Sequence, residues 1–190
     1  MKNIYEECPI LENDKFLIRR AQVTDAKELV KVYSDKNTLP FCNSDNCHGD
    51  NFYYPTEEIM KQVIEAWHLE YEGKGFVRFS IIDKESNEAI GTIELFNRKA
   101  DDYFNNCGLL RLDVRSDYER EDVIFNLLTF ITKPTYELFD CTMIATKARI
   151  YAVERIAALK RAGYVKSEEK IVGSDGTIYG DYWVINRHNF

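Results

Sequence analysis

The chain has 190 residues, of which 45% are hydrophobic and 13% aromatic, so it can bury a core and is too apolar to be disordered. Its formal charge of −7 argues against a broad nucleic-acid or membrane-surface role, which would need a basic face. Its apolar runs are too short to span a bilayer, and charges stand where a signal peptide needs its apolar core. We therefore expect one cytoplasmic domain over residues 1–190, with no nucleic-acid or membrane partner.

The first part of the chain predicts one strand and two helices. Thr24 or Asp25 is the expected N-cap of the first helix, and Thr56 opens the second after Pro55. The long loop between the helices is rich in Asn, Asp, Cys and Tyr, and loops of that length are often functional. The expected elements are a strand at 15–21, a helix at 24–35, a loop at 37–55 and a helix at 55–73. The expected core stripe of the second helix is Ile59, Val63, Ala66 and Trp67.

The rest of the chain alternates strands and helices. A helix that tolerates Pro134 and a helix ended by Gly163 are expected, and an Asp-Gly turn closes the last hairpin. The expected elements are strands at 76–83, 90–96 and 107–114, a helix at 122–139, a strand at 141–148, a helix at 151–163 and a hairpin at 164–185. The order β-α-α-β-β-β-α-β-α-β-β predicts an α/β (α+β) domain with a mixed, mostly antiparallel sheet flanked by helices.

Cysteine and histidine residues do not predict a metal site. The five cysteines are an odd, scattered set, which is typical of reduced cytosolic thiols rather than of a disulfide framework. Cys42, Cys47 and His48 form the sharpest local cluster, but no second pair at a matching spacing follows. We expect a loop with buried or idle thiols there, and His68 is expected at a surface or in ordinary packing.

The stretch "RSDYEREDVIFNLL", residues 115–128, joins a strand to a helix, which is a natural place to bind a phosphate. It contains no glycine, and it is acidic at Asp117, Glu119, Glu121 and Asp122. In one interpretation it is an altered anion site, in which Arg115 and Arg120 pair with the carboxylates or with the ligand. In the other, Ser116 and Glu119 form a capping box, and the chain's own carboxylates take the donors that a phosphate would use. The residues leave both interpretations open.

Several phrases together resemble the Gcn5-related N-acetyltransferase superfamily, and most closely its ribosomal-protein-alanine and aminoglycoside acetyltransferase-like branch. The phrases are "PILENDKFLIRRAQVTDA", "EAIGTIELF", "LLRLDVRSDYEREDVIFNLL" and "VERIAALKRAGYV". The similarity runs from about residue 9 to residue 187. It implies an acyl-CoA N-acyltransferase-like fold, acetyl-CoA as co-substrate, and acetyl transfer to a primary amine, of a small molecule or a peptide, by direct attack in a ternary complex. It is also compatible with a homodimer, and with the alternative of a catalytically degenerate member that serves as a binding or regulatory module.

The resemblance also implies the residues at the cofactor. The strand, turn and helix that match the family's pyrophosphate site, with one later position, give Leu112, Val114, Glu119, Arg120, Glu121, Asp122, Val123, Ile124 and Arg155. The chain departs from the family at its landmarks. Glu119, Asp122 and Ile124 replace the basic residue and the glycines of the turn. Elsewhere Ala152 and Arg155 stand for an Asn and a Ser, Leu159 for a tyrosine, and Gly108 or Leu109 for a carboxylate.

Glu94 is the candidate general base, since it lies mid-strand beside the expected groove. The alternative for Glu94 is a solvated strand face opposite Ile93 and Leu95. Asp113 is the second, weaker catalytic candidate, with a structural role as its alternative. A backbone N–H near Asp113 or Val114 is the expected oxyanion donor.

Other side chains have simpler explanations. Tyr151 and Tyr164 are possible proton donors whose alternative is core packing, and Cys107 has no histidine near it in sequence to activate it. The aromatic "NFYYP", residues 51–55, is expected to shape an acceptor pocket. The acidic composition favours a basic acceptor, although no motif names the amine.

Overall fold

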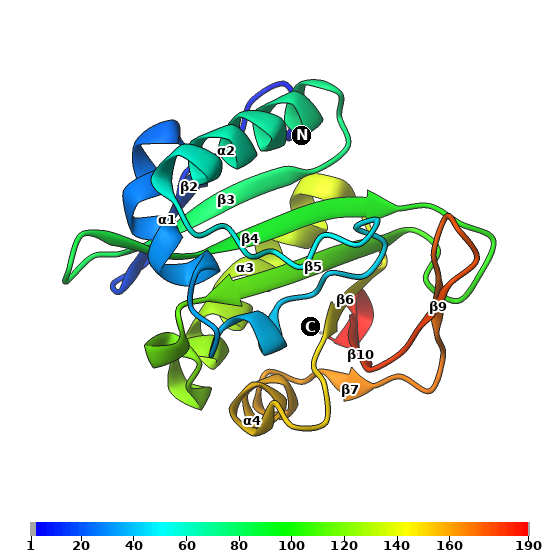
Figure 1. Cartoon of the computed structure of the whole chain (residues 1–190). Helices are drawn as coiled ribbons and strands as arrows, with labels where there is room; N and C mark the ends of the chain where they lie inside the picture. The colour runs from blue at the N-terminus through cyan, green and yellow to red at the C-terminus, as the bar shows by residue number, and fades with distance from the viewer. Residues whose placement is uncertain (1–2, 190) are drawn as a thin grey trace.

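The computed structural model describes residues 3–189 (Figure 1). The helices are α1 (Ala26–Tyr33), α2 (Glu57–Glu72), α3 (Glu121–Phe139) and α4 (Val153–Arg161). The strands are β1 (Leu11–Glu12), β2 (Phe16–Arg20), β3 (Val77–Asp83), β4 (Glu88–Arg98), β5 (Cys107–Val114), β6 (Met143–Lys147), β7 (Val165–Lys166), β8 (Ile171–Val172), β9 (Ile178–Tyr179) and β10 (Tyr182–Asn186). This order of helices and strands is the predicted one, apart from short additional strands near the two ends.

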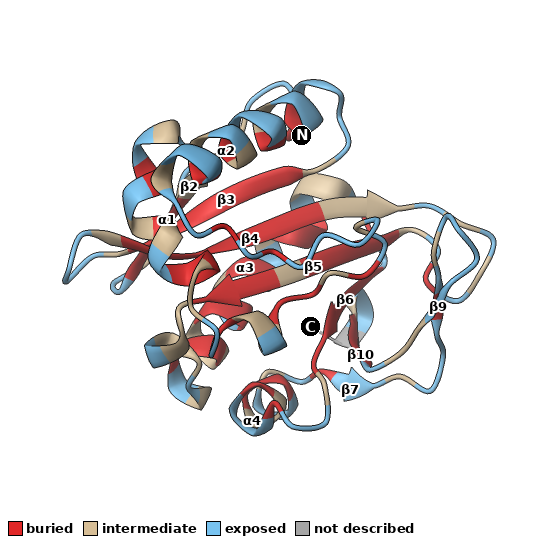
Figure 2. Ribbon diagram, viewed as in Figure 1, coloured by how far each residue is buried: buried red, intermediate tan, exposed pale blue. Residues whose placement is uncertain are grey.

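One sheet organises the molecule. Its strand order is β1-β2-β3-β4-β5-β6-β10-β7, and β5 and β6 are its only parallel pair among the described residues. Helices α3 and α4 pack on one face, and α1 and α2 pack on the other. Figure 2 shows the central strands as the most buried part of the chain. The predicted fold class, a mostly antiparallel sheet flanked by helices, is confirmed.

Local signals place the helix ends as expected. The Thr56 side chain accepts a hydrogen bond from the Ile59 N–H at the start of α2, and the helix ends at Gly73. Pro134 lies inside α3, and Gly163 follows α4 with φ +88°. Gly163 is suited to that left-handed backbone because it has no Cβ.

The predicted core stripe of α2 is wrong at Ile59 and Ala66, which are exposed, and only partly right at Val63, which is half-buried against the core. The buried residues are Met60, Ile64, Trp67 and Tyr71, of which only Trp67 was expected. Ile59, which was expected inside, is 38% exposed. Two apolar stripes run side by side on this helix, and the one with the longer side chains faces the sheet.

The closing hairpin is more elaborate than expected. Strand β7 pairs with β10, while the Asp175–Gly176 turn belongs to a separate two-stranded sheet of β8 and β9. Gly176 has φ +82°, which is the left-handed conformation expected for glycine in such a turn.

Strands β5 and β6 diverge halfway along their length. They pair from Cys107 with Met143 to Leu110 with Thr146, whereas β5 continues against β4 as far as Val114. The backbone of β5 beyond Leu110 therefore has no sheet partner on its β6 side. Within residues 3–189, no helix combines the length and hydrophobicity that crossing a bilayer requires.

Candidate functional site

Polar side chains form two rows across the face of the sheet that α1 and α2 cover. The strand register aligns Arg78 with Glu94 and Arg111 in one row, and Ser80 with Thr92 and Asp113 in the next. Side chains alternate along a strand, so these groups point away from α3. All of them except Arg111 are at most 3% exposed. The sheet register therefore brings together charges that lie far apart in the sequence.

Glu94 lies between two arginines. One of its carboxylate oxygens accepts a hydrogen bond from Arg78, and the other accepts from Arg111 at 2.8 Å. Glu94 is 1% exposed, so the alternative of a solvated strand face is wrong. The reason is that both neighbouring strands place a guanidinium beside it. Burial acts to lower the pKa of Arg78, but Glu94 and the other negative groups around it hold that pKa above its ordinary value.

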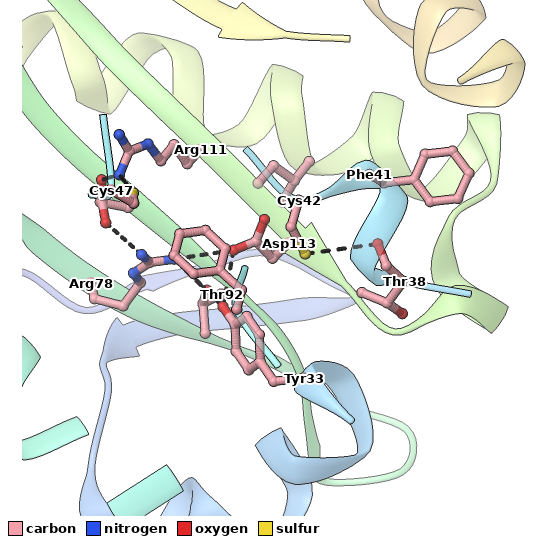
Figure 3. Close-up of polar contacts among 12 residues, drawn as sticks. Tyr33, Thr38, Phe41, Cys42, Cys47, Arg78, Thr92, Arg111 and Asp113 are labelled. Carbon is pink, nitrogen blue, oxygen red and sulfur yellow. Dashed lines mark hydrogen bonds and ion pairs between the residues drawn. The ribbon is translucent and has the colours of Figure 1, made fainter. Parts of the chain in front are cut away.

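Asp113 ties helix α1 to the sheet. Its Oδ2 accepts from the Tyr33 hydroxyl at 3.0 Å and from Arg78 at 3.2 Å (Figure 3). The Thr92 hydroxyl lies 2.6 Å from the same tyrosine oxygen. Burial first, and then the Asp113 charge, raise the pKa of Tyr33 well above its ordinary value. The tyrosine hydroxyl therefore stays protonated and serves as a donor at neutral pH.

A pocket of about 520 Å³ opens beside the Glu94 row. Arg78, Glu94 and Arg111 line it, and the Arg78 guanidinium lies 4.6 Å from the centre of the Trp67 ring. Its aromatic lining residues are Phe52, Tyr54, Trp67, Phe76 and Phe96. Two of these come from the stretch 51–55 that was expected to shape an acceptor pocket. The pocket combines apolar walls with a charged, ion-paired side.

Glu119 forms a buried ion pair with Arg155 of α4. The two carboxylate oxygens accept from Arg155 Nε and Nη2 at 2.8 and 2.7 Å, and the two side chains are 6% and 4% exposed. The remaining Arg155 nitrogen donates to the Leu112 carbonyl at 2.8 Å. Burial lowers and Glu119 raises the pKa of Arg155, which ends above its ordinary value. Glu119, Arg155 and Leu112 were all expected to contact the cofactor, and here they bind one another.

A carboxylate from another helix caps the start of α3. The Glu121 N–H donates to the Glu154 side chain at 2.8 Å. Of the two interpretations of this stretch, the capping box is wrong: Ser116 belongs to a short 3-10 turn, and the Glu119 carboxylate binds Arg155 instead of reaching back to it. A buried guanidinium offers two charge-assisted hydrogen bonds, which a single backbone N–H does not match.

The other expected cofactor residues surround this helix start. Arg120 and Asp122 form an exposed pair at 3.4 Å, with side chains 59% and 61% exposed. Val114, Val123 and Ile124 are buried in the apolar core. Arg115 binds Asp117 at 2.7 Å and Glu88 at 2.9 Å. The acidic turn is thus largely neutralised by arginines of the chain itself.

Residues 38–47, here called the crossing segment, run over the point where β5 and β6 diverge (Figure 1). The Asp45 carboxylate accepts from Lys147 of β6 at 2.6 and 2.8 Å and from the Tyr182 hydroxyl at 3.0 Å. Its backbone carbonyl accepts from Arg111 of β5 at 2.7 Å. Asp45 therefore connects β5, β6 and β10 in front of the gap between the strands.

The other end of the crossing segment meets α4. The Pro40 carbonyl accepts from the Tyr151 hydroxyl at 2.7 Å, and the Phe41 carbonyl accepts from Arg155 at 3.4 Å. Cys42 is 4% exposed, and its thiol lies against Asp113. Burial, followed by the Asp113 charge, raises the pKa of that thiol well above its ordinary value.

The remaining candidates have mainly packing roles. Tyr164 is buried beside Thr132 in the core, and burial raises its pKa. Cys107 is fully buried, and burial likewise raises its pKa. Cys47 accepts from Arg111 at 3.4 Å, while His48 is exposed. Across residues 3–189, no group of three or more His, Cys, Asp or Glu side chains is arranged to hold a metal ion.

The family's other landmark positions are also packed inside. Ala152 and Leu159 are 3% and 0% exposed. A Cβ added to Gly108 would lie 3.0 Å from Thr135 and 3.1 Å from Cys141, so a carboxylate has no room there.

Sequence reasoning missed Arg78, Arg111, Asp45 and Lys147. A local signal existed for Arg78, Arg111 and Lys147, because each is a charge inside an apolar strand run. Such a charge is buried only when it is paired. The partners, however, lie on other strands or in the loop, and only the fold brings them close.

No protein-family model and no curated protein matches the chain, whereas solved structures do. A GNAT-family acetyltransferase from Bacillus anthracis is 12% identical, with a TM-score of 0.69 over 95% of this chain and 99% of that one. RimJ from Mycobacterium smegmatis, in complex with a CoA disulfide, is 14% identical, with a TM-score of 0.70 over 96% of this chain and 88% of that one. A ribosomal-protein-S5-alanine acetyltransferase from Vibrio fischeri is 16% identical, with a TM-score of 0.66 over 94% and 97%. The chain has the fold of the Gcn5-related N-acetyltransferases.

Proposed function

We propose that the protein is an acyl-CoA-dependent N-acyltransferase that transfers an acetyl group to a primary amine by direct attack in a ternary complex. The observation that carries the proposal is the divergence of β5 and β6 after Leu110 and Thr146, directly beside the pocket that Arg111 and Glu94 line. A groove for an acyl donor and a pocket for an acceptor would then share strand β5. The similarity to solved acetyltransferases, some of them in complex with CoA, supports this assignment.

Strand β5 offers an oxyanion donor in this arrangement. The Arg115 N–H donates to Ile90 of β4, whereas the Leu112 carbonyl faces the gap and accepts from Arg155. The N–H groups of alternate residues point to the same side of a strand, so the Val114 N–H also faces the gap. Of the two expected donors, Val114 rather than Asp113 is therefore the one that we assign to a developing oxyanion.

Glu94 stays the proposed general base, with Arg111 as the residue that controls it. Both Glu94 oxygens are bound by guanidinium groups, and Arg78 is the deeper partner, at 3% exposure. Arg111 is 13% exposed and borders the pocket, so it is the partner better able to yield to an incoming amine. Asp113 would keep Arg78 in place.

The acceptor is proposed to be a small-molecule amine or a peptide amine. Acetyltransferases that act on ribosomal proteins are among the similar structures, and exposed Asp50 and Glu70 lie among the lining residues of the pocket. These carboxylates would attract a cationic group. A cytoplasmic location and a homodimer belong to the same proposal, and analytical ultracentrifugation would test the dimer.

A thermal-melt titration with acetyl-CoA, supported by calorimetry, tests the proposal. A ligand at about 100 times its dissociation constant adds about 2.7 kcal/mol of stability, which for a domain of this size is a rise on the order of 5–10 °C. Thiol release from acetyl-CoA in the presence of a panel of primary amines then tests transfer, and Glu94→Gln should abolish it. The matched control is Asp102→Asn, which weakens a pair with Arg98 outside the groove. A flat melting temperature up to millimolar acetyl-CoA would refute the proposal.

The buried Glu119–Arg155 pair favours a second candidate, a binding or regulatory module without transfer. This pair and the Glu154 carboxylate occupy groups that a pyrophosphate would use. In this case acetyl-CoA would neither bind nor be cleaved. The same titration separates the two candidates.

A further inference from the structure

We infer that the crossing segment, residues 38–47, is a built-in gate that closes the groove between β5 and β6 and has to leave it before an acyl donor can enter. The inference rests on the proposed function, because it concerns access to the same groove. It follows from what the segment covers, from how it is held and from the charges that it would leave behind.

The crossing segment satisfies groups on both sides of the gap. Lys147 of β6 and Arg111 of β5 both bind Asp45, one through its carboxylate and the other through its carbonyl. At the far end, the Arg155 guanidinium binds the Leu112 and Phe41 carbonyls together. Leu112 and Arg155 are two of the positions that the family resemblance assigns to the cofactor. The segment therefore occupies the Arg155 guanidinium and covers the gap beside β5 that the cofactor would need, so the two exclude each other.

Polar contacts hold most of the segment in place. Its buried side chains are Thr38, Cys42, Asn43 and Asp45, all of them small or polar. The neutral hydrogen bonds among them exchange for bonds to water when the segment lifts, with a small net change per bond, whereas the Asp45–Lys147 ion pair costs more to open. Leu39, Cys42 and Cys47 of the segment pack in the apolar cluster under α1 and α2, so its release exposes some apolar surface, but less than release of a whole helix would.

A bend suited to a hinge lies at the C-terminal end of the crossing segment and continues just beyond it. Its residue Asn46 has φ +59°, and His48 and Gly49 just beyond it have φ +52° and +90°. Residues other than glycine adopt this left-handed conformation at a cost, and they keep it only when the surroundings enforce it. Gly49 adopts this conformation freely, and Asn46 is held by Ser174, whose N–H and hydroxyl both donate to its side-chain oxygen at 2.9 Å, so the bend is a fixed point about which residues 38–45 can move.

The open groove would be more cationic than the closed one. Lys147 is 8% exposed and has Asp45 as its ion-pair partner, so removal of Asp45 leaves an unpaired ammonium in the gap. Arg155 loses the Phe41 carbonyl at the same time. Both changes favour an anionic ligand, and an acyl-CoA carries its phosphates as anions. The contacts of the segment thus favour the closed state while the groove is empty. The cations that it leaves unpaired favour the open state once an anionic ligand is bound.

The alkylation rate of Cys42 reports the position of the segment. Full-length protein is treated with iodoacetamide, and labelling is quantified per peptide by mass spectrometry. Cys141, which is 0% exposed and lies two residues before β6, reports global unfolding in the same sample. Saturating acetyl-CoA should accelerate Cys42 labelling at least tenfold and leave Cys141 unchanged. Asp45→Asn should accelerate it without ligand and tighten acetyl-CoA binding at least tenfold, whereas Asp102→Asn should change neither.

Each other outcome overturns the inference. If acetyl-CoA binds the wild type and Cys42 labelling stays slow, the segment does not block the groove, and the proposed transferase function survives. If Asp45→Asn exposes Cys42 but acetyl-CoA binds neither protein, both the gate and the transferase function are wrong. If the wild type and Asp45→Asn bind acetyl-CoA with equal affinity, the inference of a gate is also wrong. If Asp45→Asn fails to fold, the labelling rate of Cys42 in the wild type, with and without acetyl-CoA, decides the inference.

Discussion

Replacement of Glu119 by glutamine tests whether the acidic turn is part of the folded core. The change leaves the Arg155 guanidinium, in a residue that is 3% exposed, without an anionic partner. Loss of one member of a buried ion pair costs about 3–5 kcal/mol. Arg155 keeps the Leu112 carbonyl, and glutamine still offers one amide oxygen, so we expect a loss near the lower end, about 3 kcal/mol.

Urea unfolding followed by tryptophan fluorescence measures this loss. Asp122→Asn in the same turn is the matched control, because its partner Arg120 is 59% exposed and the pair should contribute no more than about 0.5 kcal/mol. The double variant Glu119→Leu with Arg155→Met should recover most of the loss, since apolar residues often replace a buried pair at no cost in stability. A Glu119→Gln variant that loses less than about 1 kcal/mol, within the range of ordinary surface changes, would refute the reasoning.

Three further predictions concern pH, the sheet and the start of α3. Burial raises the pKa of Cys42 above its ordinary 9.0, so the folded state keeps a thiol proton that the unfolded state releases. The stability that this proton contributes is fully present below pH 9 and is lost as the pH rises. Urea unfolding between pH 8.5 and 10 should therefore show a slope that Cys42→Ala reduces by about 0.8 kcal/mol per pH unit on average, approaching the limit of about 1.4 at the upper end, and an unchanged slope would contradict it. Gly91→Ala should destabilise by about 2–3 kcal/mol in the same assay, because its Cβ would lie 2.3 Å from the Asp113 carbonyl oxygen. Gly180→Ala, with nothing within 4 Å of the added Cβ, is the control and should stay near wild type. Glu154→Gln should lower the melting temperature by the equivalent of about 0.5–1 kcal/mol at low salt, and less at high salt, because a charge leaves the N-terminus of α3; a loss that does not depend on salt would exclude this electrostatic explanation.

Local signals in the sequence were sufficient for the helices and strands. Thr56 caps α2, and Gly163 ends α4, through contacts within a few residues of each. These features depend on backbone geometry that neighbouring residues determine. The order of elements, and with it the fold class, was therefore predictable.

Burial of charge was not predictable, because it depends on register. Glu94 is a mid-strand carboxylate in the sequence, and a solvated face was the simpler expectation. The registers of β3 with β4 and of β4 with β5 place Arg78 and Arg111 opposite it. Likewise, Glu119 was open to two interpretations, a local capping box or an altered anion site, because its partner Arg155 lies 36 residues further along the chain. Neither set of ion pairs can be recognised from the hydrophobic periodicity or the residue spacing of the sequence.

The position of the crossing segment also has a consequence for the order of folding. Asp45 precedes its partners Lys147 and Tyr182 by 102 and 137 residues, so its contacts close some of the longest loops in the molecule. At a synthesis rate of about 5–20 residues per second, Asp45 leaves the peptidyl-transferase centre roughly 5–20 s before Lys147 is added. Until then the Asp45 carboxylate lacks both of these partners, while α1, α2, β3 and β4 can already associate. Closure of the segment over the gap at Asp45 should accordingly be among the last events of folding, and the groove should exist in open form before it is ever covered.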